Sequence, residues 1–116
     1  MTIYKNYIEG EWVSSAEIFN NINPSDTADI IGEYAQADKA QTEQAIESAA
    51  RAFEGWSRSG IQQRSEILDN IGNAILARKA ELGDLLAREE GKTLPEAIGE
   101  VTRAAQIFKF FSGEAL

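Results

Sequence analysis

The chain has neither cysteine nor histidine among its 116 residues. Without cysteine it can form no disulfide and offers no thiol nucleophile, and zinc sites built on either residue type are excluded. A serine–histidine catalytic triad is excluded for the same reason. Carboxylates, hydroxyls, lysine and tyrosine remain, so a reaction centre built within this chain alone would have to use them.

Basic clusters and long apolar runs are also lacking. The net charge is −8, which repels nucleic-acid phosphates and anionic membrane surfaces. No apolar stretch approaches the roughly 18 residues that a membrane-spanning helix needs, and the N-terminus lacks the apolar core of a signal peptide. We therefore expect no nucleic-acid or membrane partner, and the lack of a targeting segment favours a cytoplasmic location.

The composition is that of a small globular domain. Hydrophobic residues make up 43% of the chain and charged residues 26%, as in ordinary soluble proteins. A chain of this length can bury a modest core. No repeat, low-complexity segment or linker divides it, so we expect one domain at most over residues 1–116.

Short strands are expected over about residues 3–35. The predicted strands are residues 7–8, 12–13, 17–22 and 29–35. A tight hairpin turn joins the first two, with Gly10 supplying a positive φ. The cluster Asn23-Pro24-Ser25-Asp26-Thr27 is a turn between the last two. This order predicts a small antiparallel element.

Helical periodicity follows over about residues 38–115 and predicts three helices. The first ends near Trp56, the second closes at Gly91, where glycine can take the left-handed conformation that ends a helix, and the third begins near Leu94. Each start has a candidate capping box. The three pairs are Asp38 with Gln41, Ser59 with Gln62, and Thr93 with Glu96. Strands followed by helices predict an α+β fold.

Each predicted helix has an apolar face. The faces consist of Ile46, Ala49, Ala50, Phe53 and Trp56 in the first helix, Leu68, Ile71, Ile75, Leu82 and Leu85 in the second, and Ala97, Val101, Ala104, Ala105, Phe108 and Phe111 in the third. Burial gains and chain entropy are near balance in a domain this small, so we expect self-association to cover part of these faces. The same faces suit a freestanding helical protein-interaction module, which is the alternative to an enzyme.

Polar side chains near the second helix end have structural and functional interpretations. Glu89 and Glu90 are adjacent in a helix and point in different directions, which disfavours a shared acid pair. We expect Lys92 to interact with the helix carbonyls rather than with a phosphate, and Trp12 and Trp56 to be buried packing residues. The glycines at 83, 91 and 99 lack the spacing of a dinucleotide-binding loop. Nothing in the chain assembles a nucleophile, base and oxyanion site.

The stretch from Arg88 to Val101 resembles the E-x-G-K-x-x-x-E-A-x-x-E-V signature of the aldehyde dehydrogenase superfamily. Four further segments are similar to that family in the same order and at the same spacing. They are Tyr7 to Val13, Ile22 to Asp26, Asp38 to Trp56, and Arg64 to Leu68. Together the five segments extend the resemblance over nearly the whole chain.

The resemblance implies the N-terminal portion of an NAD(P)-dependent aldehyde dehydrogenase subunit, flanking the α/β cofactor domain. Members oxidise an aldehyde to a carboxylic acid. A cysteine thiolate adds to the aldehyde, hydride leaves to NAD or NADP, and a glutamate-activated water hydrolyses the thioester. The catalytic residues and nucleotide-binding strands lie beyond residue 116 in the family order. The resemblance therefore implies no catalytic residue, no cofactor-binding residue, no bound cofactor and no activity for this chain alone.

Two residues match a monovalent-cation site that many relatives hold near the N-terminus. They are Ile22, through its backbone carbonyl, and Glu89, through its carboxylate, and a hard cation prefers such oxygen ligands. The sequence from Lys92 to Ala97 looks most like the sequences of members that act on small acidic semialdehydes, such as 2-oxoglutarate or succinate semialdehyde. The resemblance also implies the remainder of the subunit as a partner.

Overall fold

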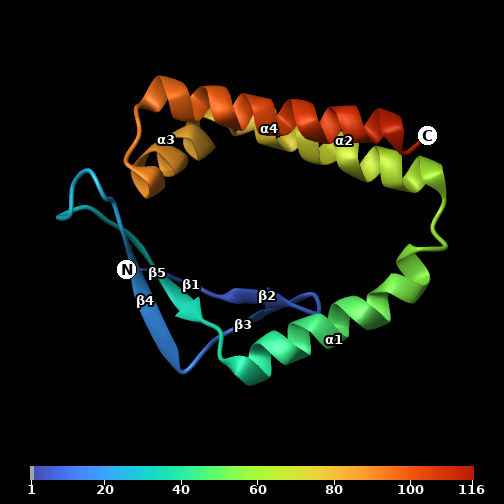
Figure 1. Cartoon of the computed structure of the whole chain (residues 1–116), viewed down its shortest axis with the longest axis horizontal. Helices are drawn as coiled ribbons and strands as arrows, with labels where there is room; N and C mark the ends of the chain where they lie inside the picture. Colours follow the sequence, from blue (N-terminus) through green and yellow to red (C-terminus); the bar gives the residue numbers. More distant parts are fainter. Residues whose placement is uncertain (1) are drawn as a thin grey trace. The chain divides into compact units, whose positions relative to one another are not determined.

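The computed structural model describes residues 2–116. The chain folds into two compact units (Figure 1). Unit 1 comprises the chain up to Ile22 together with Thr27–Arg58, and unit 2 comprises Asn23–Asp26 together with Ser59–Leu116. Strands followed by helices form the predicted α+β fold.

Unit 1 contains two small sheets and one helix. The strands are β1 (Ile3–Tyr4), β2 (Asn6–Ile8), β3 (Glu11–Val13), β4 (Glu17–Ile22) and β5 (Ile30–Gln36). β2 and β3 form the predicted hairpin, whose turn residues Glu9 and Gly10 both have positive φ, 55° and 79°. This is the backbone of a type I′ turn, which matches the twist of a hairpin. Gly10 adopts the positive φ at no steric cost, whereas Glu9 is a non-glycine residue in a strained region.

The second sheet has the order β1-β5-β4. β4 and β5 are antiparallel, from Glu17 opposite Gln36 to Ile22 opposite Ile30, with an irregularity between Asn21 and Ile22. β1 and β5 are parallel, so the prediction of antiparallel strands is right for two pairings and wrong for the third. Parallel neighbours need a long crossover connection, and here the hairpin and β4 together provide it.

Helix α1 (Lys39–Trp56) begins at Asp38 as predicted. The Asp38 carboxylate accepts a hydrogen bond from the Gln41 backbone N–H at 2.8 Å. The Gln41 side chain does not complete the capping box, because its amide donates to the Ser14 carbonyl at 2.7 Å and accepts from the Ser15 hydroxyl at 2.6 Å. Asp38 therefore caps the helix, and the Gln41 side chain links α1 to the segment after β3.

Unit 2 is built from three helices, which makes four helices within residues 2–116 instead of the three predicted. They are α2 (Ile61–Ala77), α3 (Lys79–Glu90) and α4 (Leu94–Glu114). The helix predicted to close at Gly91 is divided at Arg78, where φ is −107°. The apolar stripe has a gap there, since the positions three and four residues after Ile75 are Arg78 and Lys79. The predicted Ser59–Gln62 box is also wrong: Gly60 is the N-cap of α2, and Gln62 donates to Glu66.

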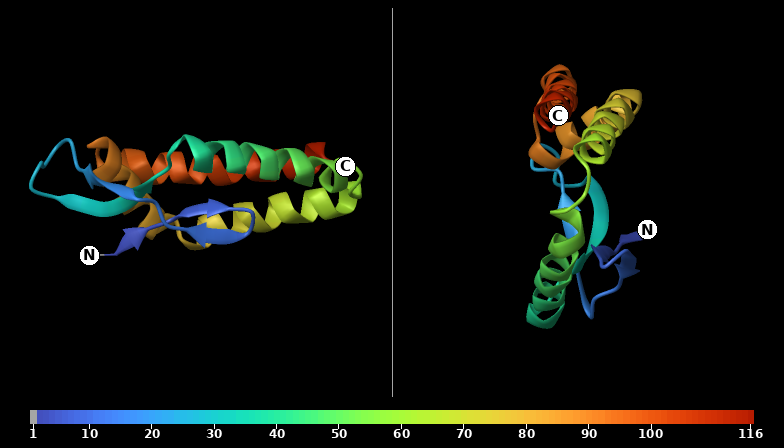
Figure 2. Two further views of the ribbon diagram at one scale, coloured as in Figure 1. Left: turned by 90° about the horizontal axis from the view of Figure 1, so that it is seen from below. Right: turned by 90° about the vertical axis from the view of Figure 1, so that its right-hand side faces the viewer.

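Helix α4 packs along both α2 and α3 through small side chains (Figures 1 and 2). The buried residues of the three helices are Ser65, Gly72, Gly83, Ala87, Ala97, Val101, Ala105 and Ser112. The Ser112 hydroxyl donates to the Ser65 carbonyl at 2.8 Å, which satisfies a polar group at the α2–α4 crossing. A Cβ at Gly72 would lie 2.9 Å from Lys109 Cγ and 3.1 Å from the Ala105 carbonyl, so glycine permits the close approach.

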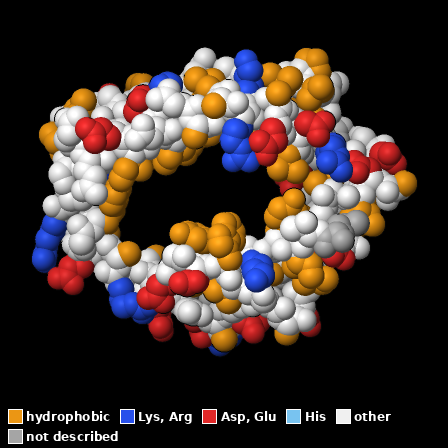
Figure 3. All heavy atoms as spheres, turned by 180° about the vertical axis from the view of Figure 1, so that it is seen from behind, with side chains coloured by type: hydrophobic (Ala, Val, Ile, Leu, Met, Phe, Trp, Pro, Cys, Tyr) orange, Lys and Arg blue, Asp and Glu red, His pale blue; other side chains and the backbone are white. Residues whose placement is uncertain are grey.

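Large apolar side chains remain at the surface of both units (Figure 3). Trp12 is 67% exposed and Trp56 is 46% exposed, so the expectation that both tryptophans are buried is wrong. No residue of α1 is buried. Within the described residues, each helix is too short or too polar to cross a lipid bilayer.

Candidate functional site

The signature stretch forms the turn between α3 and α4. Gly91 ends α3 with φ 67° and ψ 27°, the left-handed conformation predicted for it. Its backbone N–H and that of Lys92 both reach the Ala87 carbonyl, the latter at 3.1 Å. These bonds satisfy a carbonyl that the helix end would otherwise leave without a partner.

The same glycine packs against the loop at residues 23–26. The Ser25 hydroxyl donates to the Gly91 carbonyl at 2.6 Å. A Cβ on Gly91 would lie 2.5 Å from Ser25 Oγ and 2.8 Å from Pro24 Cγ. The loop holds its own shape, because the Ser25 N–H donates to the Asn23 side-chain oxygen at 2.9 Å. The structure thus brings together two segments that are separate motifs in the sequence.

Lys92 is engaged with acidic side chains from both helices of the turn. Its ammonium group forms salt bridges with Glu90 of α3 and Glu100 of α4. Hydrogen bonds to Glu100 and then to Glu90 raise the pKa of Lys92 above that of an ordinary lysine. The expectation that Lys92 interacts with helix carbonyls is therefore wrong. Lys92 instead links the end of α3 to the first turns of α4.

Helix α4 begins with the predicted capping box at Thr93 and Glu96. Glu96 Oε2 accepts from the Thr93 hydroxyl at 2.6 Å and from the Thr93 backbone N–H at 3.4 Å. The hydrogen bond from the Thr93 side chain is the main cause that lowers the pKa of Glu96. Ala97, with no exposed surface, and Val101, 7% exposed, belong to the buried face of α4. Hence the signature residues named here build and hold a helix–turn–helix.

The predicted cation ligands belong to different units. Ile22 is the last residue of β4 in unit 1, and Glu89 lies in the last turn of α3 in unit 2. Their pairing around a monovalent cation stays a prediction. Residues 2–116 contain no group of three or more acidic side chains arranged to hold a metal ion.

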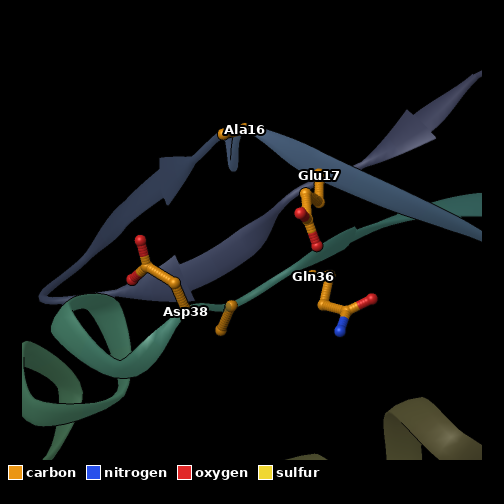
Figure 4. Close-up of a pocket in the computed structure, with 5 residues that line it drawn as sticks. Ala16, Glu17, Gln36 and Asp38 are labelled. Carbon is orange, nitrogen blue, oxygen red and sulfur yellow. The ribbon is translucent and has the colours of Figure 1, made fainter.

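A surface hollow of about 230 Å³ lies in unit 1, where β4 begins and β5 ends (Figure 4). It is lined by Ala16, Glu17, Gln36, Ala37 and Asp38. Glu17 and Gln36 come from paired positions of β4 and β5. The Asp38 carboxylate already caps α1. The lining offers two carboxylates and an amide but no hydroxyl, thiol or amine side chain, and it does not assemble a nucleophile, base and oxyanion site.

Gly83 and Gly91 of unit 2 do not leave room for a nucleotide. A dinucleotide loop needs backbone that a pyrophosphate can approach. A Cβ at Gly83 would lie 2.6 Å from Ile98 Cγ1, and Gly91 packs against Pro24 and Ser25. The backbones at Gly83 and Gly91 face protein atoms, so a pyrophosphate cannot approach them as it does in a dinucleotide-binding loop.

Known proteins resemble this chain in both sequence and fold. A profile of the aldehyde dehydrogenase family matches residues 12–116. The chain is 37% identical to the α-ketoglutarate semialdehyde dehydrogenase of Haloferax volcanii over 113 residues, covering 96% of this chain and 23% of that protein. It is 36% identical to malonate-semialdehyde dehydrogenase 1 of Shouchella clausii, covering 94% of this chain and 22% of that protein.

Among solved structures, a betaine aldehyde dehydrogenase from Staphylococcus aureus in complex with NAD⁺ has a TM-score of 0.89 and 32% identity. That match covers 94% of this chain and 22% of the solved chain. The chain therefore spans less than a quarter of the length of the relatives that it matches. Because the family profile covers most of its residues and the fold agrees, the chain belongs to the aldehyde dehydrogenase family.

Proposed function

We propose that this chain acts as the N-terminal part of an NAD(P)-dependent aldehyde dehydrogenase that oxidises a small acidic semialdehyde to a carboxylic acid. The observation that carries the proposal is the alignment of two semialdehyde dehydrogenases over 96% and 94% of the chain. The signature turn supports it, because its conformation explains why the motif has these residues. The finer choice of an acidic semialdehyde follows the names of the relatives.

The contribution of this chain to such an enzyme is structural. Gly91, Lys92 and Glu96 fix the angle between α3 and α4, and Ser25 attaches the preceding loop to that turn. The chain contains no cysteine, and Gly83 and Gly91 pack against protein atoms. In the proposed enzyme the thiol nucleophile, the base and the binding surface for NAD(P) are supplied by the rest of the subunit. The chain alone then has no aldehyde-oxidising activity.

The pairing of Ile22 and Glu89 as cation ligands remains part of the proposal. Its support is the oxygen chemistry of a backbone carbonyl and a carboxylate. The urea midpoint of the chain is then expected to be higher in a sodium or potassium salt than in an equal concentration of a salt of a bulky organic cation. Glu89→Gln should abolish that difference, and a difference that persists in the variant excludes Glu89 as a ligand.

The function is tested with a chimera. The aligned 113 residues of the Haloferax enzyme are replaced by this chain, and nicotinamide reduction is followed with a panel of semialdehydes. We expect a folded chimera that oxidises α-ketoglutarate semialdehyde, whereas this chain alone reduces no NAD⁺ or NADP⁺. A chimera that is folded but inactive would contradict the proposal, and so would turnover that stays with the isolated chain through purification.

The alternative, a freestanding helical interaction module, makes the opposite predictions. The isolated chain would be a cooperative monomer that binds no hydrophobic dye, and the chimera would not fold into an active enzyme. The exposed apolar side chains of α1 favour the part of a larger enzyme over the freestanding module. A freestanding module would be expected to bury such side chains in its own core.

A further inference from the structure

The turn of the β2–β3 hairpin contains the one non-glycine residue within residues 2–116 that has a positive φ. That residue is Glu9, with φ 55°. It takes the first position of a two-residue type I′ turn, for which asparagine, aspartate and glycine are preferred. A glutamate there has a Cβ that crowds the backbone, and it lacks the short side chain with which asparagine and aspartate hydrogen-bond locally. Turn chemistry therefore gives no reason for glutamate at this position.

A contact outside the hairpin gives such a reason. The Arg51 guanidinium of α1 donates a hydrogen bond to Glu9 Oε1 at 2.8 Å, and the two groups form a salt bridge. Charge-assisted hydrogen bonds of this kind are stronger than neutral ones. A residue held in a strained backbone conformation points to a role beyond its local structure. For Glu9 the bond to Arg51 is the contact that reaches beyond the turn.

Helix α1 depends on attachments of this kind, because none of its residues is buried. Its half-buried residues are Gln41, Ala45 and Ser48, which are three or four residues apart and therefore share one side of the helix. Gln41 attaches the start of that side to the segment after β3. From residue 49 to residue 56 every residue is exposed. Arg51 follows Ser48 by three residues, so it continues the same side into the exposed part of the helix.

We propose that Glu9 is a positioning residue, whose carboxylate holds the second half of α1 (residues 49–56) beside the hairpin through Arg51. This inference concerns contacts within the chain and does not rest on the proposed enzymatic function. The attachments at Gln41 and Arg51 are ten residues apart, which is about 15 Å along a helix. Two attachments at this separation fix the direction of the helix axis, whereas Gln41 alone leaves α1 able to pivot about its first turns.

The attachment is sensitive to salt. The side chains of Arg51 and Glu9 are 58% and 53% exposed, so ions in solution screen their attraction. The Debye length falls from about 10 Å at 0.1 M salt to about 3 Å at 1 M. Because an exposed ion pair contributes little to stability, we expect its loss to increase local opening by about two- to fivefold without unfolding unit 1. The orientation of the second half of α1 then depends on ionic strength.

Amide hydrogen exchange of the full chain, followed by NMR, tests this role. Glu9→Gln keeps the side-chain length, removes the charge and changes no residue of the helix. At 0.1 M NaCl it should accelerate exchange over residues 49–56 by about two- to fivefold. In the parent chain 1 M NaCl should produce a similar acceleration, and Glu9→Gln should at least halve this response to salt. Glu11→Gln is the matched control, since it removes the same charge from the same hairpin, and exchange over residues 49–56 should stay at the parent rate.

Further variants distinguish the turn from the contact. Glu9→Asn supplies a preferred turn residue without a carboxylate, so exchange should slow at the hairpin amides and accelerate over residues 49–56. Arg51→Glu alone should accelerate exchange over residues 49–56, and adding Glu9→Arg should recover at least half of that change. Equal exchange over residues 49–56 in Glu9→Gln and the parent, an equal acceleration by Glu11→Gln, or a reversed pair no better than Arg51→Glu alone would each overturn the proposal.

Discussion

Replacing Gly91 with alanine tests two features of the turn, the positive φ of residue 91 and its packing against the loop at residues 23–26. The residue has a φ of 67°, where a Cβ meets the neighbouring backbone, and it faces the loop at residues 23–26. The added Cβ would lie 2.5 Å from Ser25 Oγ, 2.8 Å from Pro24 Cγ and 3.1 Å from Ser25 N. The Ser25 hydroxyl can rotate away, but the proline ring and the backbone nitrogen cannot move without shifting the loop.

The expected cost is larger than backbone conformation alone would give. An alanine in the left-handed region costs about 1–2 kcal/mol, and forcing an extra carbon into a packed contact costs about 1–3 kcal/mol. The lower entropy of the unfolded alanine chain offsets about 0.4–1 kcal/mol. We expect Gly91→Ala to lower the free energy of unfolding of unit 2 by about 2–4 kcal/mol, which is a large part of the stability of a small domain.

Urea unfolding followed by circular dichroism at the helix band is the suitable assay. Tryptophan fluorescence would report the wrong unit, because Trp12 and Trp56 both belong to unit 1. Gly99→Ala is the matched control, since Gly99 lies inside α4 and a Cβ there meets nothing within 4 Å. That control should stabilise the helix by about 0.5–1 kcal/mol.

Two further variants separate the cost of the positive φ from the cost of the contact with the loop. Gly91→Asn keeps a residue type that tolerates positive φ but retains the steric conflict with the loop, so it should remain destabilising. Ser25→Ala removes the nearest atom and the hydrogen bond to the Gly91 carbonyl, and it should cost about 0.5–1.5 kcal/mol by itself. A Gly91→Ala midpoint equal to that of the parent chain, with Gly99→Ala behaving as expected, would refute the reasoning for this turn.

The remaining predictions concern packing and pH. Gly72→Ala should destabilise unit 2 by about 1–3 kcal/mol, because the new Cβ would lie 3.1 Å from the Ala105 carbonyl; an unchanged urea midpoint would show that α2 and α4 can separate freely. Stability should fall at acid pH, since hydrogen bonds lower the pKa values of three carboxyl groups, with Lys109 acting on Asp69, Arg78 on Glu81 and Thr93 on Glu96. Their stabilisation is present above the unfolded pKa values and is lost as pH falls through the lowered folded values, below about pH 4. At the other extreme, the raised pKa of Lys92 stabilises the fold below the ordinary lysine pKa, and this contribution is lost as pH rises through the raised value, above about pH 10. Urea midpoints measured across pH check both limbs, and an acid limb that Asp69→Asn, Glu81→Gln and Glu96→Gln together leave unchanged would contradict the assignment.

Local signals in the sequence predicted the signature turn well. Gly91, the Thr93–Glu96 pair and the proline after Leu94 each act within a few residues, so their conformation needs no knowledge of the rest of the fold. The Asp38 cap and the Gly10 turn were predictable for the same reason. All of these are confirmed by backbone angles or hydrogen bonds.

Contacts between distant segments were not predictable in this way. The Ser25–Gly91 hydrogen bond joins residues 66 positions apart, and neither residue signals the other. The parallel pairing of β1 with β5 rests on a strand of two residues, too short to show alternation. The division at Arg78 coincides with a gap in an apolar stripe. This gap is visible in the sequence, but the helix-favouring residues on both sides of it give a stronger signal for one continuous helix.

The apolar faces of α1 and α4 show where sequence patterns stop being informative. Both have apolar residues at helical spacing, and both predict a covered surface. In α4 part of the face is buried, with Ala97 and Ala105 fully covered, because α2 and α3 lie beside it, whereas Phe111 of the same predicted face is 54% exposed. In α1 the same pattern leaves Ile46 and Phe53 mostly exposed, whereas Gln41 and Arg51 of the same helix contact Ser14, Ser15 and Glu9. Periodicity identifies which side of a helix needs a neighbour, but whether that neighbour lies in the same chain is decided by the path of the chain.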